Sequence, residues 1–185
     1  MNLSKRKIKF NEQDYIEKHY IKGENAVIPI KIEKISQFYN NYDLKELTMN
    51  DELTKYIDNI TYLIPVSYSI TLEFHTPQLS EEEQRKIKKM IKMNYSMDID
   101  DIEYSMKINF WKTMTLLTIG LSLLIITYLI SSYIWTIATE CLTIAASVAI
   151  WNAVETLLLE NSSLKYKKND SLQLYDAKVI FIFDK

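Results

Sequence analysis

The alternation of apolar and polar residues that is typical of β-strands occurs in residues 27–33 and 66–75. A third strand is predicted at residues 177–183, where Ala177, Val179, Phe181 and Phe183 would share one face. Every second residue of 66–75 is apolar, which predicts a strand with one buried face and one polar face. Pro29 cannot donate a hydrogen bond to a neighbouring strand, so we expect the first segment to form an edge strand.

Helical spacing of apolar residues appears first between residues 50 and 60. Asn50 is a suitable N-cap, and four apolar side chains recur at intervals of three and four residues: Leu53, Tyr56, Ile57 and Ile60. We interpret the preceding segment, residues 36–49, as an irregular connection that packs its aromatic side chains.

A further helix is predicted from a capping box, in which Ser80 is followed three residues later by Glu83. We expect this helix to run to about Tyr95. Asp98 then predicts the cap of a new helix that continues into the apolar part of the chain. Three apolar residues of the first of these helices are expected to face the sheet: Ile87, Met90 and Ile91.

The chain contains no charged residue between Lys112 and Glu140. The 21 residues of 113–133 would rise ~1.5 Å each in an α-helix, enough to span the ~30 Å hydrocarbon core of a bilayer. A second, less hydrophobic span is predicted at about 137–158. The connection, residues 131–136, is so short that the two spans must form an antiparallel hairpin.

Taken together, these elements predict an α+β membrane protein. About three strands and two or three helices would form a small cytosolic domain, with the transmembrane hairpin inserted before the last strand. That strand is apolar and needs a sheet, and the N-terminal half offers the simplest one. We therefore expect a cytosolic α+β region at 1–107, the hairpin at 108–160, and a basic segment with the completing strand at 161–185.

Positive charge flanks the hairpin on one side of the membrane only. Lys107 and Lys112 precede the first span, and Lys165, Lys167 and Lys168 follow the second, whereas the connection between the spans has neither lysine nor arginine. The positive-inside rule then places both termini in the cytosol of a multi-pass protein of the cell membrane. The three lysines after the second span could also contact anionic lipid headgroups, or they could act as topology determinants alone.

Small residues recur every fourth position along the second span: Cys141, Ala145, Ala149 and Ala153. In lipid, small side chains let helix backbones approach closely. The stripe could therefore be an oligomerisation face, or it could pack against the first span of the same chain. We favour packing within the chain, because the hairpin must use some face.

Two polar residues, Asn152 and Glu155, lie near the cytosolic end of the second span. A carboxylate at membrane depth is costly and suggests a functional role, for example in proton or ion movement. Lys112 opens the first span at about the same depth. We therefore expect a structural Lys112–Glu155 pair in preference to a transport site.

Composition argues against several functional classes. The net charge of −2 is unlike the strongly basic surface of a nucleic-acid-binding domain. A single cysteine excludes a disulfide framework within the chain, and two glycines leave no glycine-rich phosphate loop. His19 and His75 are far apart in the sequence and have no partner pattern. We expect no enzymatic activity, no cofactor and no metal.

The end of the second span carries the pattern W-x-x-x-E-x-L-L within residues 149–159, followed by a basic stretch and a terminal strand. This arrangement resembles a group of uncharacterised bacterial membrane proteins in which a small cytosolic α+β domain carries a two-helix hairpin. The resemblance covers about 27–183 and implies this architecture without implying an activity. The basic stretch departs from the group, since it has three lysines where arginine-rich sequence is expected.

The sequence therefore leaves several functions open. Our first expectation is a non-enzymatic two-pass membrane component that anchors a small cytosolic domain, which binds a partner protein or self-assembles. The alternatives are an oligomerising membrane effector, of the defence or toxin type, and a small channel or transporter subunit. An enzyme that acts on lipid is the weakest of these hypotheses.

Overall fold

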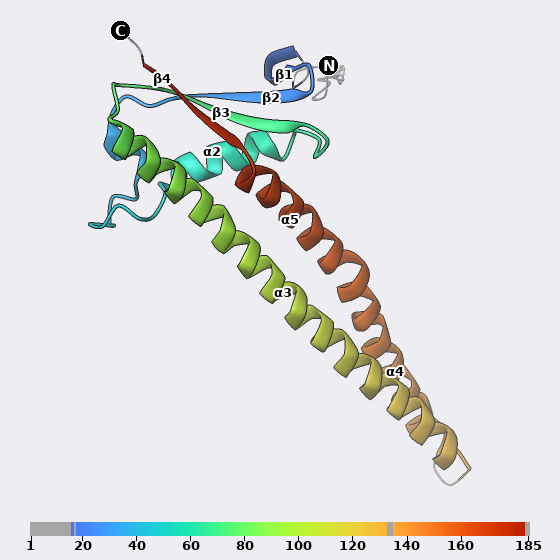
Figure 1. Cartoon of the computed structure of the whole chain (residues 1–185). Helices are drawn as coiled ribbons and strands as arrows, with labels where there is room; N and C mark the ends of the chain where they lie inside the picture. The colour runs from blue at the N-terminus through green and yellow to red at the C-terminus, as the bar shows by residue number, and fades with distance from the viewer. Residues whose placement is uncertain (1–15, 17, 133–134, 184–185) are drawn as a thin grey trace, which may run out of the picture. The chain divides into compact units, whose positions relative to one another are not determined.

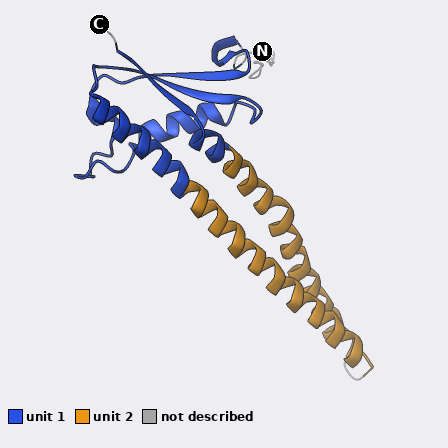
Figure 2. Ribbon diagram, in the orientation of Figure 1, with its two compact units in different colours: residues 1–97, 170–185 blue, residues 98–169 orange. Residues whose placement is uncertain are grey.

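The computed structural model describes residue 16, residues 18–132 and residues 135–183 (Figure 1). The chain divides into two compact units, which are coloured separately in Figure 2. Unit 1 comprises residues 1–97 and 170–185, and unit 2 comprises residues 98–169.

Unit 1 is an α+β unit with a four-stranded sheet in the order β1-β2-β3-β4. Its strands are β1 (Ile21–Lys22), β2 (Asn25–Lys31), β3 (Ser69–Thr76) and β4 (Lys178–Phe183). The pairs β2–β3 and β3–β4 are parallel, and β1 pairs antiparallel with β2. The three predicted strands are confirmed, and β4 does complete the sheet of the N-terminal half.

The predicted edge position of β2 needs a correction. β2 lies between β1 and β3, but β1 pairs only with Asn25 and Ala26. Pro29 lies beyond that pairing, so its missing N–H costs no hydrogen bond to β1. A second difference concerns β3, which begins at Ser69, because Val66 is in a turn and is largely exposed.

One face of the sheet carries the apolar core of unit 1. Register places Ala26 opposite Ile70, Ile28 opposite Leu72, and Ile30 opposite Phe74. Each of these side chains is buried. Val179 and Phe181 of β4 lie beside Leu72 and Phe74 and extend the same face.

Helix α2 (Asp51–Thr61) covers this core. The oxygen of the Asn50 side chain accepts hydrogen bonds from the N–H groups of Glu52 and Leu53, which confirms the predicted cap. Leu53, Ile57 and Ile60 are buried as expected. Tyr56 is 45% exposed, so it does not belong to the buried stripe.

Helix α3 (Glu81–Ile130) is one continuous helix of 50 residues, and the predicted new start at Asp98 is wrong. The chain has no glycine or proline between Glu81 and Ile119, so nothing interrupts the helical hydrogen bonds there. The capping box at its start is confirmed, since the Ser80 N–H donates to Glu83 Oε2 at 2.7 Å. In unit 1, α3 buries four core residues: Ile87, Met90, Ile91 and Tyr95.

Unit 2 contains helices alone among its described residues. They are the second part of α3, then α4 (Thr136–Glu155), the π-helical turn η2 (Thr156–Glu160) and the first part of α5 (Asn161–Tyr175). The helices Glu81–Ile130 and Thr136–Tyr175 are long and apolar enough to cross a membrane. Only 17% of the most apolar stretch of each is buried, whereas the core helix of a soluble protein would be mostly buried.

Candidate interaction surfaces

In unit 2, α3 and α4 contact each other along a seam in which Gly120 lies against Ala146 and Ile150. Gly120, Ala146 and Ala153 are buried. A Cβ added to Gly120 would lie 2.6 Å from Cγ1 of Ile150 and 3.1 Å from the carbonyl oxygen of Ala146. A larger residue at this position would therefore require the packing of Ile150 to shift, and such a close approach is the packing expected of helices in lipid.

The small-residue stripe of α4 does not stay on one face of the helix. Ala153 is buried and Ala149 is half-buried, whereas Cys141 and Ala145 are exposed. A spacing of four exceeds the 3.6 residues of a helical turn, so the stripe winds around the helix. The buried residues Ala146 and Ala153 lie seven positions apart, and Ala146 is not part of the predicted stripe.

Apolar side chains cover the outer surface of the hairpin. Examples on α3 are Leu121, Ile125 and Leu129, each more than half exposed. Two exposed hydroxyl groups on the same helices are satisfied locally, since Thr118 donates to the carbonyl of Met114 at 2.8 Å and Ser147 to that of Thr143 at 2.9 Å. Such a surface suits a hydrocarbon solvent, because it leaves these side-chain donors paired.

Lys112 pairs with Glu160 in place of the expected Glu155. Its ammonium nitrogen lies 3.3 Å from Glu160 Oε1 and 3.4 Å from Oε2. The turn η2 changes the hydrogen bonding from i→i+4 to i→i+5, which rotates the residues that follow it relative to a straight α-helix. Sequence spacing cannot reveal such a turn, so the partner of Lys112 was misassigned.

Asn152 and Glu155 are both exposed on the outside of α4. Their neighbours Trp151, Leu157 and Leu158 are exposed as well. A carboxylate and an amide thus lie within an apolar outer surface, and α3, the other helix of the hairpin, does not cover them.

The lysines that follow the second span differ in their contacts. Lys165 and Lys167 are exposed, whereas Lys168 donates to Glu103 Oε1 at 2.8 Å. This hydrogen bond and the charge of Lys168 lower the pKa of Glu103. Lys165 and Lys167 are therefore the two of the three that present their charge to the surroundings.

Unit 1 also has an exposed surface, on the loop between η1 (Ile35–Phe38) and α2. Asp43 organises it by accepting hydrogen bonds from the backbone N–H groups of Lys45, Leu47 and Thr48 at 2.8–2.9 Å. Those bonds, led by the one from Leu47, lower the pKa of Asp43 to about 2. Tyr42 and Leu44 project from this ordered loop almost fully exposed.

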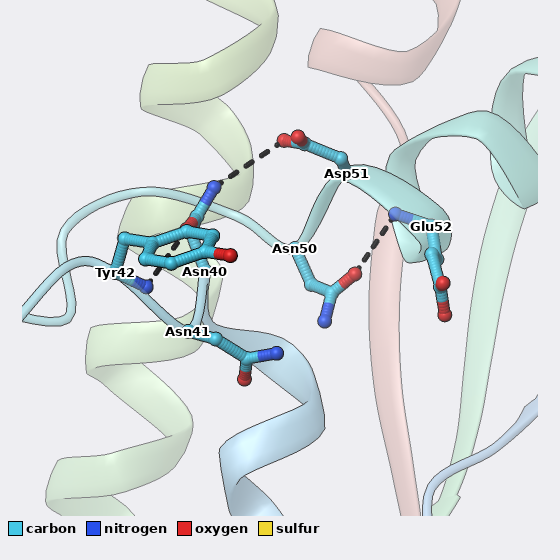
Figure 3. Close-up of a pocket in the computed structure, with 6 residues that line it drawn as sticks. All are labelled: Asn40, Asn41, Tyr42, Asn50, Asp51 and Glu52. Atoms are coloured by element: carbon cyan, nitrogen blue, oxygen red, sulfur yellow. Dashed lines mark hydrogen bonds between the residues drawn. The ribbon is translucent and has the colours of Figure 1, made fainter.

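A polar pocket lies beside this loop (Figure 3). Its lining residues are Asn40, Asn41, Tyr42, Asn50, Asp51 and Glu52. The side chain of Asn40 accepts from the N–H of Tyr42 at 3.0 Å, and its amide approaches Asp51 at 3.5 Å. Since Asn50 caps α2, these polar groups already serve the loop and the helix start, and they point to no particular ligand.

On the face of the sheet opposite the core, His75 Nε2 lies within hydrogen-bonding distance of Glu73 Oε1, at 3.0 Å. Among the described residues, no group of three or more histidine, cysteine, aspartate and glutamate side chains could hold a metal ion. Comparison with family models, with curated proteins and with solved structures finds no match to this chain.

Proposed function

We propose that this protein is a two-pass membrane component whose helical hairpin anchors a small cytosolic α+β domain in the cell membrane. The observation that carries the proposal is the inverted surface of unit 2, where small residues are inside and leucine and isoleucine side chains are outside. In water such a surface would be a very large exposed apolar patch, whereas in lipid it is the expected one. The distribution of lysines supports placing both termini in the cytosol.

The cytosolic domain is proposed to be non-enzymatic and to bind a partner protein or to self-assemble. Two features support this role. Tyr42 and Leu44 are exposed on a loop whose backbone donates several hydrogen bonds to Asp43, and tyrosine is enriched among the residues that anchor protein interfaces. The apolar strand β4 also lies at an edge of the sheet.

Membrane insertion and topology can be tested with cysteine labelling in a Cys141→Ser background. A cysteine at Ser132, between the spans, should react with an impermeant maleimide added to intact cells. A cysteine at Ser163, after the second span, should react only when the cells are opened. The protein should also stay in the membrane after carbonate extraction. Release by carbonate would refute the anchor, and the opposite labelling pattern would refute the orientation.

A second candidate function is favoured by Asn152 and Glu155. Both are exposed on an apolar helix surface, and a carboxylate in that position is stabilised if several hairpins cluster around it. Clustered hairpins could act as an oligomerising effector or as a channel. Expression should then depolarise cells, and Glu155→Gln should reduce the effect. Harmless overexpression would contradict this candidate and leave the anchor intact.

A further inference from the structure

One side of α3 in unit 1 carries a row of positive charges. This basic face consists of four residues at the helical spacing i, i+3, i+4 and i+7: Arg85, Lys88, Lys89 and Lys92. Residues at this spacing lie on one side of a helix, and all four side chains are exposed. None of the four forms an ion pair with another described residue, whereas their neighbour Lys86 pairs with Glu46. Positive charge is therefore concentrated here, on a chain whose net charge is −2.

Aromatic rings of unit 1 hold two of these cations in place. The ammonium group of Lys88 lies 5.6 Å from the ring centroid of Phe181, and that of Lys92 lies 5.4 Å from the ring centroid of Tyr175. Both contacts are within the range of a cation–π attraction. Part of the basic face is thus ordered before any partner binds, which lowers the entropic cost of binding.

A short apolar row lies beside the basic face. Lys89, Met93 and Met97 follow one another at intervals of four residues, which places them along one row of α3. Met93 is 45% exposed and Met97 is 56% exposed. Methionine side chains are flexible and adapt to the surface that covers them. The surface that complements this one has carboxylates beside apolar groups, as an acidic amphipathic helix does.

Other anionic or symmetric partners fit this surface less well. A two-fold contact with a second copy would place the basic face against itself. Lipid headgroups attract cationic clusters that lie directly beside a span, but residues 93–111 separate this face from Lys112. The net charge of −2 is unlike that of a nucleic-acid-binding domain. The rings of Phe181 and Tyr175 also lie under lysines, so they do not offer bases a free stacking surface.

We propose that the basic face of α3, together with Met93 and Met97, is the docking surface for an acidic amphipathic segment of a partner protein. Carboxylates of that segment would pair with Arg85 and the three lysines, and its apolar side chains would cover the two methionines. The proposal rests on the partner-binding half of the proposed function and names the chemistry of the partner.

Charge reversal in the full chain tests the electrostatic part. The probe is a fluorescent helical peptide that carries glutamates at i, i+3, i+4 and i+7 beside a row of leucines. Its binding to the chain in nanodiscs of uncharged phosphatidylcholine is measured by anisotropy. Arg85→Glu/Lys89→Glu should raise the dissociation constant at least about tenfold, because like charges then face each other. The matched control Lys45→Glu/Lys55→Glu makes the same charge change elsewhere on unit 1 and should alter it less than about threefold.

The apolar row is tested by truncation on both sides of the contact. Met93→Ala/Met97→Ala should weaken binding of the peptide about fivefold, since less apolar surface is covered. A second peptide, with alanine in place of each leucine, should bind the wild-type chain and this variant with equal affinity. Hydrogen exchange of β2 and β3 checks that every variant is folded.

Equal affinity of Arg85→Glu/Lys89→Glu and the wild-type chain for the first peptide would overturn the proposal. Tighter binding to a DNA duplex or to phosphatidylglycerol vesicles than to the peptide would overturn it as well, in favour of nucleic acid or lipid. Loss of peptide binding in Tyr42→Ala, with none in the charge-reversed chain, would move the contact to the loop at Asp43. None of these results touches the anchor, which is tested by carbonate extraction and by labelling at Ser132 and Ser163.

Discussion

The two units of this chain bury opposite kinds of side chain. Unit 1 encloses large apolar groups such as Phe38, Phe74 and Ile87, and it keeps its charges outside. Unit 2 encloses Gly120 and Ala146 and exposes most of its leucine and isoleucine side chains. Water drives the first arrangement through the hydrophobic effect. In the membrane setting that we propose for unit 2, lipid supplies no such drive between helices, so close packing would decide the second arrangement.

The contrast extends to how each unit is held together. Three aromatic rings, those of Phe38, Phe74 and Phe181, contact one another in unit 1 with centroids 5.1–6.4 Å apart. The helices of unit 2 instead meet through backbone and small side chains at Gly120. A mutation should therefore destabilise unit 1 when it removes side-chain volume, and unit 2 when it adds side-chain volume.

The largest effect is expected from Phe74→Ala. Loss of a fully buried ring from the aromatic cluster should destabilise unit 1 by about 3–5 kcal/mol. Hydrogen exchange of β2 and β3 should accelerate. Fluorescence should change little, because all three tryptophans lie outside unit 1. Tyr42→Ala, at an exposed position, is the control and should stay within about 0.5 kcal/mol. Equal loss of structure in both units would contradict their separation.

Adding a charge at an exposed apolar position should have a large effect in unit 2 and a small effect in unit 1. Ile125 and Leu44 are both exposed, one in unit 2 and one in unit 1. Ile125→Lys should raise the free energy of membrane insertion by about 3–4 kcal/mol in a translocon assay, making insertion less favourable, because the charge enters hydrocarbon. Leu44→Lys should be nearly neutral for thermal stability. Normal insertion of Ile125→Lys would show that this face does not meet lipid.

Adding side-chain volume in the seam should have the next largest effect on stability. Gly120→Ala inserts a methyl group against Ile150 and the carbonyl of Ala146, and should destabilise the hairpin by about 1–3 kcal/mol. Tryptophan fluorescence during unfolding in mixed micelles measures the change. Ile150→Ala in the same chain should recover part of the loss, since the nearest contact is with that side chain. Stabilisation by Gly120→Ala alone would disprove close packing.

The smallest effect concerns the ion pair at the end of the seam. Lys112 and Glu160 are about half exposed, so their coupling in a double-mutant cycle should be about 0.2–1 kcal/mol. The parallel cycle between Lys112 and Glu155 should give no coupling. Each substitution is to alanine, and unfolding is followed by the same fluorescence signal. Coupling to Glu155 with none to Glu160 would place the two helices in a different register.

Much of unit 1 could be predicted because local signals agreed with the final packing. The alternation in β3, the Asn50 cap and the Ser80–Glu83 capping box depend on neighbours in the sequence, and each is present in the structure. Periodicity failed for Tyr56, which fits the helical stripe but is largely exposed.

The candidate surfaces were less predictable. Of the stripe from Cys141 to Ala153, only Ala153 is fully buried, because the stripe winds away from the seam. Gly120 was not singled out, because a single glycine in an apolar run looks the same whether it packs or not. The order of the loop at Asp43 also escaped notice, since its acceptor bonds are visible only after folding.

The sequence alone determined which parts of the chain meet water and which are apolar enough for lipid, because solvent preference is a property of composition and period. It also determined the strands and the helix starts, which depend on local hydrogen bonding. Only the tertiary structure decided that α3 is unbroken, that Lys112 reaches Glu160, and that β4 lies at an open edge. Those features depend on distances between residues far apart in the chain, which periodicity does not encode.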